Sequence, residues 1–221
     1  MKRLILTVLA LILAVSIADA RRKREMAGTV KDGFYQDDAY ELKIPINDNW
    51  KANVGTEGAS TRVILVQKKF AVPQRYADAA DYTYIPKVVV WVDTSSLSPQ
   101  VFLDSLVSDT WKSKQKKSID ADFDILSQKD LTPKGRRLRT LAKETSSEWE
   151  GEAKYVKDVA SSSSDNSGVR VSGKYYGLII AVKHSGTMYL FQLMCESDYG
   201  ETILKEVRSM VDSLAFVKAA D

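Results

Sequence analysis

The sequence predicts an α+β fold in which an antiparallel β-sheet is flanked by helices on both faces, an α/β/α sandwich. Residues 175–183 and 187–196 are apolar on both sets of alternate positions, so both sides of these strands need a cover. The connection at 184–187 is short and contains a glycine, which predicts a hairpin and therefore antiparallel pairing. A segment with one apolar stripe at helical spacing follows over 198–214 and can cover one of the faces.

The first 20 residues are typical of an export signal. A short basic start precedes an apolar run over 4–17 and an A-x-A cleavage site at 18–20. The apolar run is shorter than the about 20 residues that a membrane-spanning helix needs. We therefore expect cleavage before Arg21 and export to the periplasm or the cell exterior. The basic run 21–24 opposes translocation, so a short signal anchor and later removal of this run remain as alternatives.

Residues 21–38 are basic and then polar, which predicts an irregular lead-in to a single domain over 39–218. Within that domain, alternating and β-branched residues predict strands. Ser98 and Pro99 predict a helix start, because serine caps helices and proline fits the first helical position. The predicted strands lie at 40–44, 62–68, 87–93 and 123–128, and 138–149 is interpreted as a strand although its propensities also allow a helix.

The remaining segments are interpreted as turns, loops and one capped helix. A turn delivers Trp50 to the core, and residues 70–85 form a long loop. The serine-rich stretch at about 158–173 is interpreted as a mobile loop, because its polar low-complexity composition cannot supply a core. Asp198, followed three residues later by Glu201, predicts a capping box at the start of the final helix.

Charge and cysteine content limit the function classes. The chain holds 32 lysines and arginines against 29 aspartates and glutamates, a formal net charge of +3. No nucleic-acid partner is expected, because proteins that bind nucleic acids usually carry a clear basic excess. Cys195 is the only cysteine, which excludes an internal disulfide. Its apolar strand predicts a buried packing residue, with a reactive thiol as the alternative.

The sequence contains no recognisable catalytic or metal-binding constellation. His184 is the only histidine, and its neighbour Ser185 lies in the predicted turn, where serine is expected for turn geometry alone. Phosphate loops and zinc spacings are absent from the sequence, so we expect no cofactor and no metal. Asp120, Asp122 and Asp124 lack the glycine and the distal glutamate of a calcium loop and are interpreted as solvated charge.

Two basic clusters form a candidate surface patch. We hypothesise that they lie on one side of the domain and meet an anionic partner, either lipid headgroups or an acidic envelope protein. The alternatives are cations at a helix C-terminus for the first cluster and ordinary solvated charge for both. The clusters are Lys112, Lys114, Lys116 and Lys117, and Lys134, Arg136, Arg137 and Arg139.

Several short segments occur in a recognisable order: Tyr40-Glu41-Leu42-Lys43-Ile44-Pro45, Trp50, Val88-Val89-Val90-Trp91-Val92-Asp93, Phe102-Leu103-Asp104-Ser105-Leu106, Tyr176-Gly177, Met188-Tyr189-Leu190-Phe191 and Val211-Asp212-Ser213-Leu214-Ala215-Phe216. Over residues 40–217 this order resembles the PsbP-like family with its bacterial exported members, whose fold is shared with the Ran-binding protein Mog. The resemblance implies an antiparallel sheet flanked by helices. Plant PsbP proteins stabilise the oxygen-evolving side of photosystem II, but no residue set here matches a metal site of that family, so that role is not carried over.

These observations predict an exported, non-catalytic binding or assembly-support protein of the PsbP-like type. Its expected partners are an envelope protein or an anionic lipid surface. The alternative is a carrier that holds a lipid or another small apolar ligand in a cleft between sheet and helices. A hydrolase is the third hypothesis.

Overall fold

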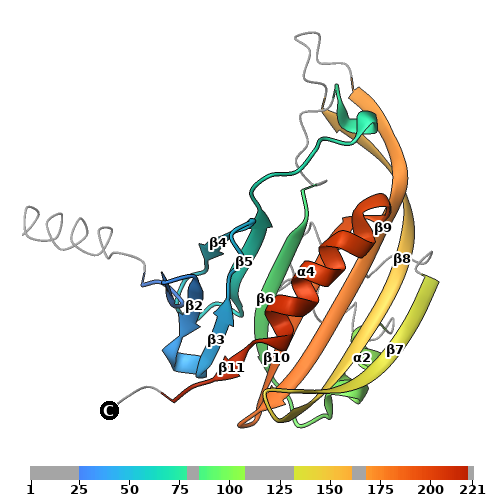
Figure 1. The fold of residues 1–221 in the computed structure, drawn as a ribbon. Coiled ribbons are helices and arrows are strands. Elements are labelled where there is room, and N and C mark those ends of the chain that lie inside the picture. The colour runs from blue at the N-terminus through green and yellow to red at the C-terminus, as the bar shows by residue number, and fades with distance from the viewer. Residues whose placement is uncertain (1–24, 79–84, 108–131, 161–167, 219–221) are drawn as a thin grey trace, which may run out of the picture.

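The computed structural model describes residues 25–78, 85–107, 132–160 and 168–218, and strands dominate them (Figure 1). The helices of this part are α2 (Pro99–Val107) and α4 (Gly200–Asp212), with 3-10 turns η1 (Asp38–Tyr40), η2 (Gln74–Tyr76) and η4 (Ser197–Tyr199). The strands are β1 (Thr29–Lys31), β2 (Phe34–Asp37), β3 (Leu42–Pro45), β4 (Trp50–Val54), β5 (Thr61–Gln67), β6 (Lys87–Thr94), β7 (Thr132–Leu141), β8 (Glu144–Ala160), β9 (Gly168–His184), β10 (Thr187–Glu196) and β11 (Ala215–Phe216).

The strands form two antiparallel sheets. A seven-stranded sheet has the order β4-β5-β6-β10-β9-β8-β7, and a four-stranded sheet has the order β1-β2-β3-β11. β10 lies at the centre of the large sheet, where Leu190 pairs with Trp91 of β6 on one side and with Ala181 of β9 on the other. The short strand β11 follows α4 and pairs with β3, so the C-terminal end of the domain closes the small sheet.

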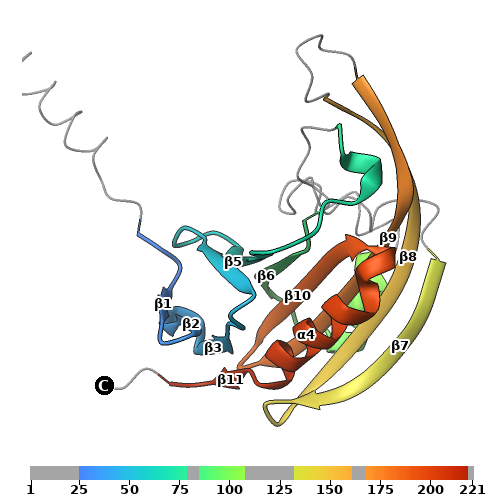
Figure 2. The same ribbon diagram turned by 45° about the horizontal axis from the view of Figure 1, so that its top comes forward.

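Side chains of the large sheet divide into two buried clusters by their alternation along each strand. Phe191 packs in the cluster that contains Val207 of α4, and its neighbour Leu190 packs in the cluster that contains Phe102 and Leu106 of α2. α4 lies over β10 and also contacts β3 (Figure 2). The predicted antiparallel sheet is confirmed, whereas the predicted sandwich is only partly shown, because the described chain offers a single helix to each cluster.

The predicted hairpin and several strand positions are confirmed. β9 and β10 pair from His184 opposite Thr187 onward, and α2 begins at Pro99 after Ser98. Trp50 is buried as expected: its backbone N–H closes the predicted turn on the Asn47 oxygen at 2.8 Å, and Trp50 is also the first residue of β4. Its indole Nε1 also donates a hydrogen bond to Glu206 Oε2 at 2.8 Å, which ties β4 to α4.

The lead-in predicted as irregular over 21–38 instead contains β1 and β2. The buried positions of β2 are Tyr35 and Asp37. Because the core face of this strand carries a tyrosine and a carboxylate, the sequence lacks the apolar alternation that predicts a strand. Both side chains are satisfied by Arg62, whose Nε lies 2.6 Å from Asp37 Oδ2 and whose backbone oxygen accepts from the Tyr35 hydroxyl.

Three other boundaries are corrected. Residues 138–149 belong to two strands, because Ala142 and Lys143 form a turn with φ of 48° and 70°. The turn contains no glycine, so the sequence did not indicate it. The stretch predicted as a loop at 158–173 overlaps the ends of β8 and β9, where Ala160 pairs with Gly168. The predicted capping box at Asp198 is wrong: this residue lies inside η4, and the N-cap position of α4 is Tyr199, without a side-chain cap. The predicted strand at 123–128 lies outside the described residues.

Candidate functional site: a groove beside α4 and the free edge of β7

An open groove with a volume of about 560 Å³ runs along one side of α4. Its lining residues recur every three or four positions, so they share one face of the helix. They are Glu201, Leu204, Lys205, Arg208, Ser209, Asp212 and Ser213. Two of them, Arg208 and Asp212, also contact side chains of the strands at the end of the large sheet, so this face of the helix looks toward β7 and β8.

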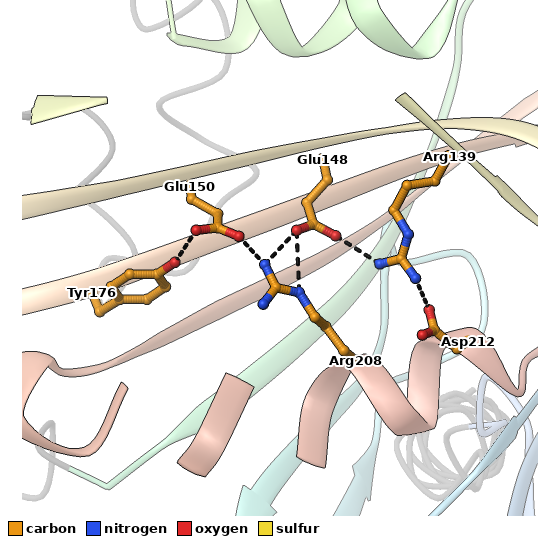
Figure 3. A network of polar contacts seen from close by, with 6 residues as sticks. All are labelled: Arg139, Glu148, Glu150, Tyr176, Arg208 and Asp212. Atoms are coloured by element: carbon orange, nitrogen blue, oxygen red, sulfur yellow. Dashed lines mark hydrogen bonds and ion pairs between the residues drawn. The ribbon is translucent and has the colours of Figure 1, made fainter. Parts of the chain in front are cut away.

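A buried carboxylate, Glu148 of β8, organises the contacts between α4 and the sheet (Figure 3). Its side chain is 1% exposed. Oε1 accepts hydrogen bonds from Arg208 Nη2 at 2.5 Å and from Arg208 Nε at 3.2 Å, and Oε2 accepts from Arg139 Nη1 of β7 at 2.7 Å. Both carboxylate oxygens are therefore satisfied by charged donors, which is the condition under which a charge is tolerated in a protein interior.

The network continues to the surface on both sides of Glu148. Arg208 also pairs with Glu150, which accepts a hydrogen bond from the Tyr176 hydroxyl, and Arg139 also pairs with Asp212 of α4 (Figure 3). Exposure of the side chains rises outward, from 1% at Glu148 to 45% at Asp212. The centre of the network is thus fixed while its ends reach solvent beside the groove.

Electrostatics keep this network in one charge state. Burial raises the pKa of Glu148, but hydrogen bonds from Arg208 and Arg139 outweigh burial and hold the pKa below its usual value. Burial, assisted by the negative charge of Glu148, raises the pKa of Tyr176 to about 12, so its hydroxyl stays protonated and donates to Glu150. Glu148 is consequently charged and Tyr176 neutral near neutral pH.

The strand β7 forms one edge of the large sheet, next to this network. Its two-residue turn makes Leu141 and Glu144 the pair that closes the hairpin with β8. In an antiparallel pair, the backbone N–H and C=O groups of every second residue point toward the partner strand. Because those of Leu141 point toward β8, those of Arg137 and Arg139 do so too. The backbone N–H and C=O groups of Arg136, Leu138 and Thr140 face away from the sheet, and no strand of the described residues pairs with them.

The predicted basic patch is divided by the structure. Lys112, Lys114, Lys116 and Lys117 lie outside the described residues, so their meeting with the second cluster stays a prediction. Lys134 and Arg136 lie in β7, Arg137 is exposed on β7, and Arg139 is engaged by Glu148 and Asp212. The second cluster is thus part of an edge strand, not a segment ahead of a strand.

Edge strands commonly carry charges because these prevent uncontrolled pairing with other chains. A structural role therefore accounts for part of the basic cluster. It does not account for its neighbour Leu138, which is a large apolar side chain that is 64% exposed. The edge thus combines backbone groups that are unpaired within the described part of the chain, an exposed arginine and an exposed leucine.

The side chains considered for catalysis occupy other places. His184 Nδ1 lies 2.8 Å from Glu144 Oε1, Nε2 lies 3.2 Å from Glu41 Oε2, and the ring stacks on Phe216 at a centroid distance of 4.0 Å. Both ring nitrogens face carboxylates, which leaves neither for a serine hydroxyl. These contacts fasten the β9–β10 hairpin to the small sheet.

Cys195 and the aspartates have structural or undetermined positions. Cys195 is buried, and burial raises the pKa of its thiol to about 12, which disfavours the reactive form. Asp120, Asp122 and Asp124 lie outside the described residues. Within the described residues no group of three or more histidine, cysteine, aspartate or glutamate side chains is placed to hold a metal ion.

No helix in that part of the chain is long and apolar enough to span a membrane.

The sequence interpretation missed Glu148, Glu150 and Arg208. A signal was present, since residues 144–152 alternate and place Glu148 and Glu150 on one face of a strand whose other face carries Trp149. Such alternation is normally taken to mark a solvated face. Glu148 is buried instead, because Arg208 pairs with it. The two residues are 60 positions apart in the sequence, so only the fold brings them together.

Comparisons with known proteins give matches at the level of solved structures. No protein-family model and no curated protein matches the chain. CyanoP, the cyanobacterial PsbP of Synechocystis sp. PCC 6803, is 11% identical, with a TM-score of 0.49 over 86% of this chain and 96% of that one. LpqN of Mycobacterium tuberculosis, described as involved in cell envelope biogenesis, is 13% identical, with a TM-score of 0.44 over 79% and 82%. A protein of unknown function from Pseudomonas aeruginosa is 8% identical, with a TM-score of 0.39 over 89% and 99%.

One of these structures is a PsbP, and the sequence shows a resemblance to the PsbP-like family. All three identities lie below 25% and all three TM-scores below 0.5. The similarity therefore concerns the arrangement of strands and helices and conveys no function, ligand or partner to this chain.

Proposed function

We propose that the chain is an exported, non-catalytic binding protein that supports assembly in the cell envelope by holding a partner protein at the free edge of β7. The observation that carries this proposal is the row of backbone groups at Arg136, Leu138 and Thr140 that no described strand pairs with, on the edge next to the contacts of α4. Export is supported by the basic start, apolar run and cleavage site of residues 1–20.

The chemistry of the edge indicates the kind of partner. An extended segment that adds to β7 gains main-chain hydrogen bonds, and its side chains alternate between the two faces of the sheet. On the face of α4, acidic side chains would meet exposed Arg137; on the opposite face, an apolar side chain would cover Leu138. The fitting partner segment therefore alternates acidic and apolar residues.

A second copy of the chain fits this edge poorly. Antiparallel pairing of β7 with another β7 would set the basic residues 134–139 of the two copies against each other, and like charges across strands are destabilising. An anionic lipid surface would attract the arginines but would leave the backbone groups of the edge unpaired. In this proposal the large sheet is a rigid scaffold, with α4 over one face and α2 over the other.

Site-specific photocrosslinking in envelope preparations tests the proposal. A photoreactive benzoylphenylalanine replaces Leu138, and the matched control carries it at Lys51, which is exposed on β4 at the opposite edge of the same sheet. We expect a discrete protein adduct from position 138 only, and a severalfold weaker adduct when Arg137→Glu is added. Equal adducts from both positions, lipid adducts alone, or no adduct from position 138 would overturn the proposal.

A carrier of a small apolar ligand is the second candidate function. One observation favours it: two buried polar side chains, Gln192 and Trp149, have no hydrogen-bond partner in the described structure. They lie on the side of the large sheet that α2 covers, away from the groove beside α4.

A further inference from the structure

Two fully buried polar side chains on the α2 side of the large sheet have polar atoms that no described residue satisfies. Gln192 of β10 and Trp149 of β8 are each 1% exposed. Among the described residues, neither the Oε1 nor the Nε2 atom of Gln192 has a hydrogen-bond partner, and the same holds for Nε1 of Trp149. Buried polar side-chain atoms are paired in the large majority of cases in native proteins, so these three atoms need an explanation.

The two residues lie in one row across the sheet. Gln192 pairs with Ile179 of β9, and Ile179 pairs with Trp149. All three therefore point to the same side, and Ile179 packs in the cluster that α2 covers. Two strand spacings separate the backbones of Gln192 and Trp149, about 10 Å, which lets a long amide side chain and an indole approach one bound group from two sides.

The position of the indole depends on a glycine two residues later. A Cβ atom added to Gly151 would lie 2.4 Å from Cη2 of Trp149, so the indole lies across this glycine. Gly151 pairs with Gly177 of β9, and neither residue brings a side chain to this part of the sheet. The missing side chain of Gly151 thus gives the large ring its room.

The surroundings determine what these polar atoms can bind. The cluster around them is built of apolar and aromatic side chains, and its two tyrosines, Tyr76 and Tyr175, hydrogen-bond to each other at 2.8 Å. One carboxylate, Glu196, is fully buried on the same face of β10 as Gln192. An anion would lose its hydration there and would meet the carboxylate of Glu196 instead of a counter-charge. Met188 and Met194 flank the row on the same strand face, and methionine repacks readily around a guest molecule.

We infer that the α2 side of the sheet binds a small, uncharged apolar molecule that carries a hydroxyl or amide group. The polar group accepts hydrogen bonds from Trp149 Nε1 and Gln192 Nε2 and donates one to Gln192 Oε1, while the apolar part lies among Met188, Met194 and the side chains of α2. This site lies on the opposite side of the sheet from the groove beside α4, so the inference does not depend on partner binding at β7.

The test compares four neutral and charged probes on the full chain: 1-decanol and decanamide, with decane and decanoate at pH 8 as comparators. Gln192→Leu and Trp149→Phe remove the polar atoms and retain apolar bulk. Ser146→Ala is the matched control, because Ser146 Oγ is also buried without a partner in the described structure, but belongs to the strand positions that face α4. If Gln192→Leu fails to fold, Gln192→Met takes its place, because it also removes the amide and keeps a long apolar side chain.

We expect decanol and decanamide to raise the melting temperature of the wild type and of Ser146→Ala, with decane and decanoate much weaker. Gln192→Leu should weaken decanol binding at least tenfold, and its ligand-free melting temperature should equal or exceed that of the wild type, because an unpaired polar group has been removed. Two outcomes would overturn the inference. One is undiminished decanol binding by Gln192→Leu. The other is the absence of binding together with a lowered melting temperature in both variants, which would assign these atoms to a buried structural water.

Discussion

Two arginine–carboxylate networks hold this domain together, and they differ in how far they are closed. Around Arg62, both the guanidinium and the carboxylate of Asp37 are 1% exposed, and their Nε and Oδ2 atoms lie 2.6 Å apart. Around Glu148, the carboxylate is equally buried, but Arg139 and Arg208 are 16% and 25% exposed. We call the network around Arg62 the closed network, because both partners are buried, and the network around Glu148 the open network, because its arginines reach solvent.

In the closed network, each of the three guanidinium nitrogens donates a hydrogen bond inside the protein. Arg62 Nη1 binds the backbone oxygen of Ala59 at 2.9 Å and Nη2 binds that of Ala27 at 3.1 Å, so this side chain pins the small sheet to β5. The open network instead ends at the groove and the free edge of β7. The comparison teaches that the same charge pairing can close a junction inside the fold, as at Arg62, or leave charged ends at the surface, as at Asp212.

The largest effect should come from the closed network. Asp37→Ala leaves Arg62 buried without its counter-charge, and we expect a loss of about 3 to 5 kcal/mol in the free energy of unfolding. Asp212→Ala removes a carboxylate that is 45% exposed from the open network, and we expect a loss of at most about 1 kcal/mol. Urea denaturation of both variants measures the difference. Similar losses in both would abolish the distinction between closed and open networks.

A smaller effect is expected at the buried centre of the open network. Glu148→Gln keeps the shape of the side chain but removes the charge that Arg139 and Arg208 bind, and we expect a loss of about 2 to 3 kcal/mol, the range for hydrogen bonds to charged groups.

The same residue predicts an acid dependence. Because the pKa of Glu148 is lowered in the folded state, its contribution to stability is present above its usual value of 4.5 and is lost as the pH falls through the folded-state pKa. Between pH 7 and pH 3 the wild type should therefore lose more stability than Glu148→Gln. Parallel stability curves for the two proteins would show that Glu148 is not held in its charged form by the arginines.

The smallest effect on stability is expected at the exposed end. Arg137→Glu changes an exposed residue of an edge strand and should alter the free energy of unfolding by no more than about 0.5 kcal/mol. Urea denaturation checks this value and validates the same substitution as a binding variant. A large loss of stability would assign Arg137 to the fold rather than to partner binding.

The sequence predicted elements wherever hydrophobic periodicity alone decides the structure. Both faces of β10 were identified because Leu190 and Phe191 are apolar neighbours that point to opposite sides. Prediction failed where polar residues form the core face, as at Tyr35 and Asp37 of β2, or where non-glycine residues make a tight turn, as at Ala142.

The candidate site was only half predictable for a related reason. The excess of basic residues at 134–139 is visible in the sequence, and the structure places it on an edge strand. The network beside it depends on Glu148 meeting Arg208, two residues with no local pattern that links them. The missing partners of Gln192 and Trp149 are equally invisible in sequence, because strand alternation shows that a residue is buried and not whether its polar atoms are paired.

Residue-resolved amide hydrogen exchange of the free chain by NMR tests most directly whether β7 is an open edge. The account predicts an alternating pattern: slow exchange at Arg137, Arg139 and Leu141, whose amides face β8, and fast exchange at Arg136, Leu138 and Thr140, whose amides face solvent. A bound partner strand should slow the second set without changing the first. Slow exchange at all six positions in the free chain would show that the edge is already covered and would contradict the proposed binding site.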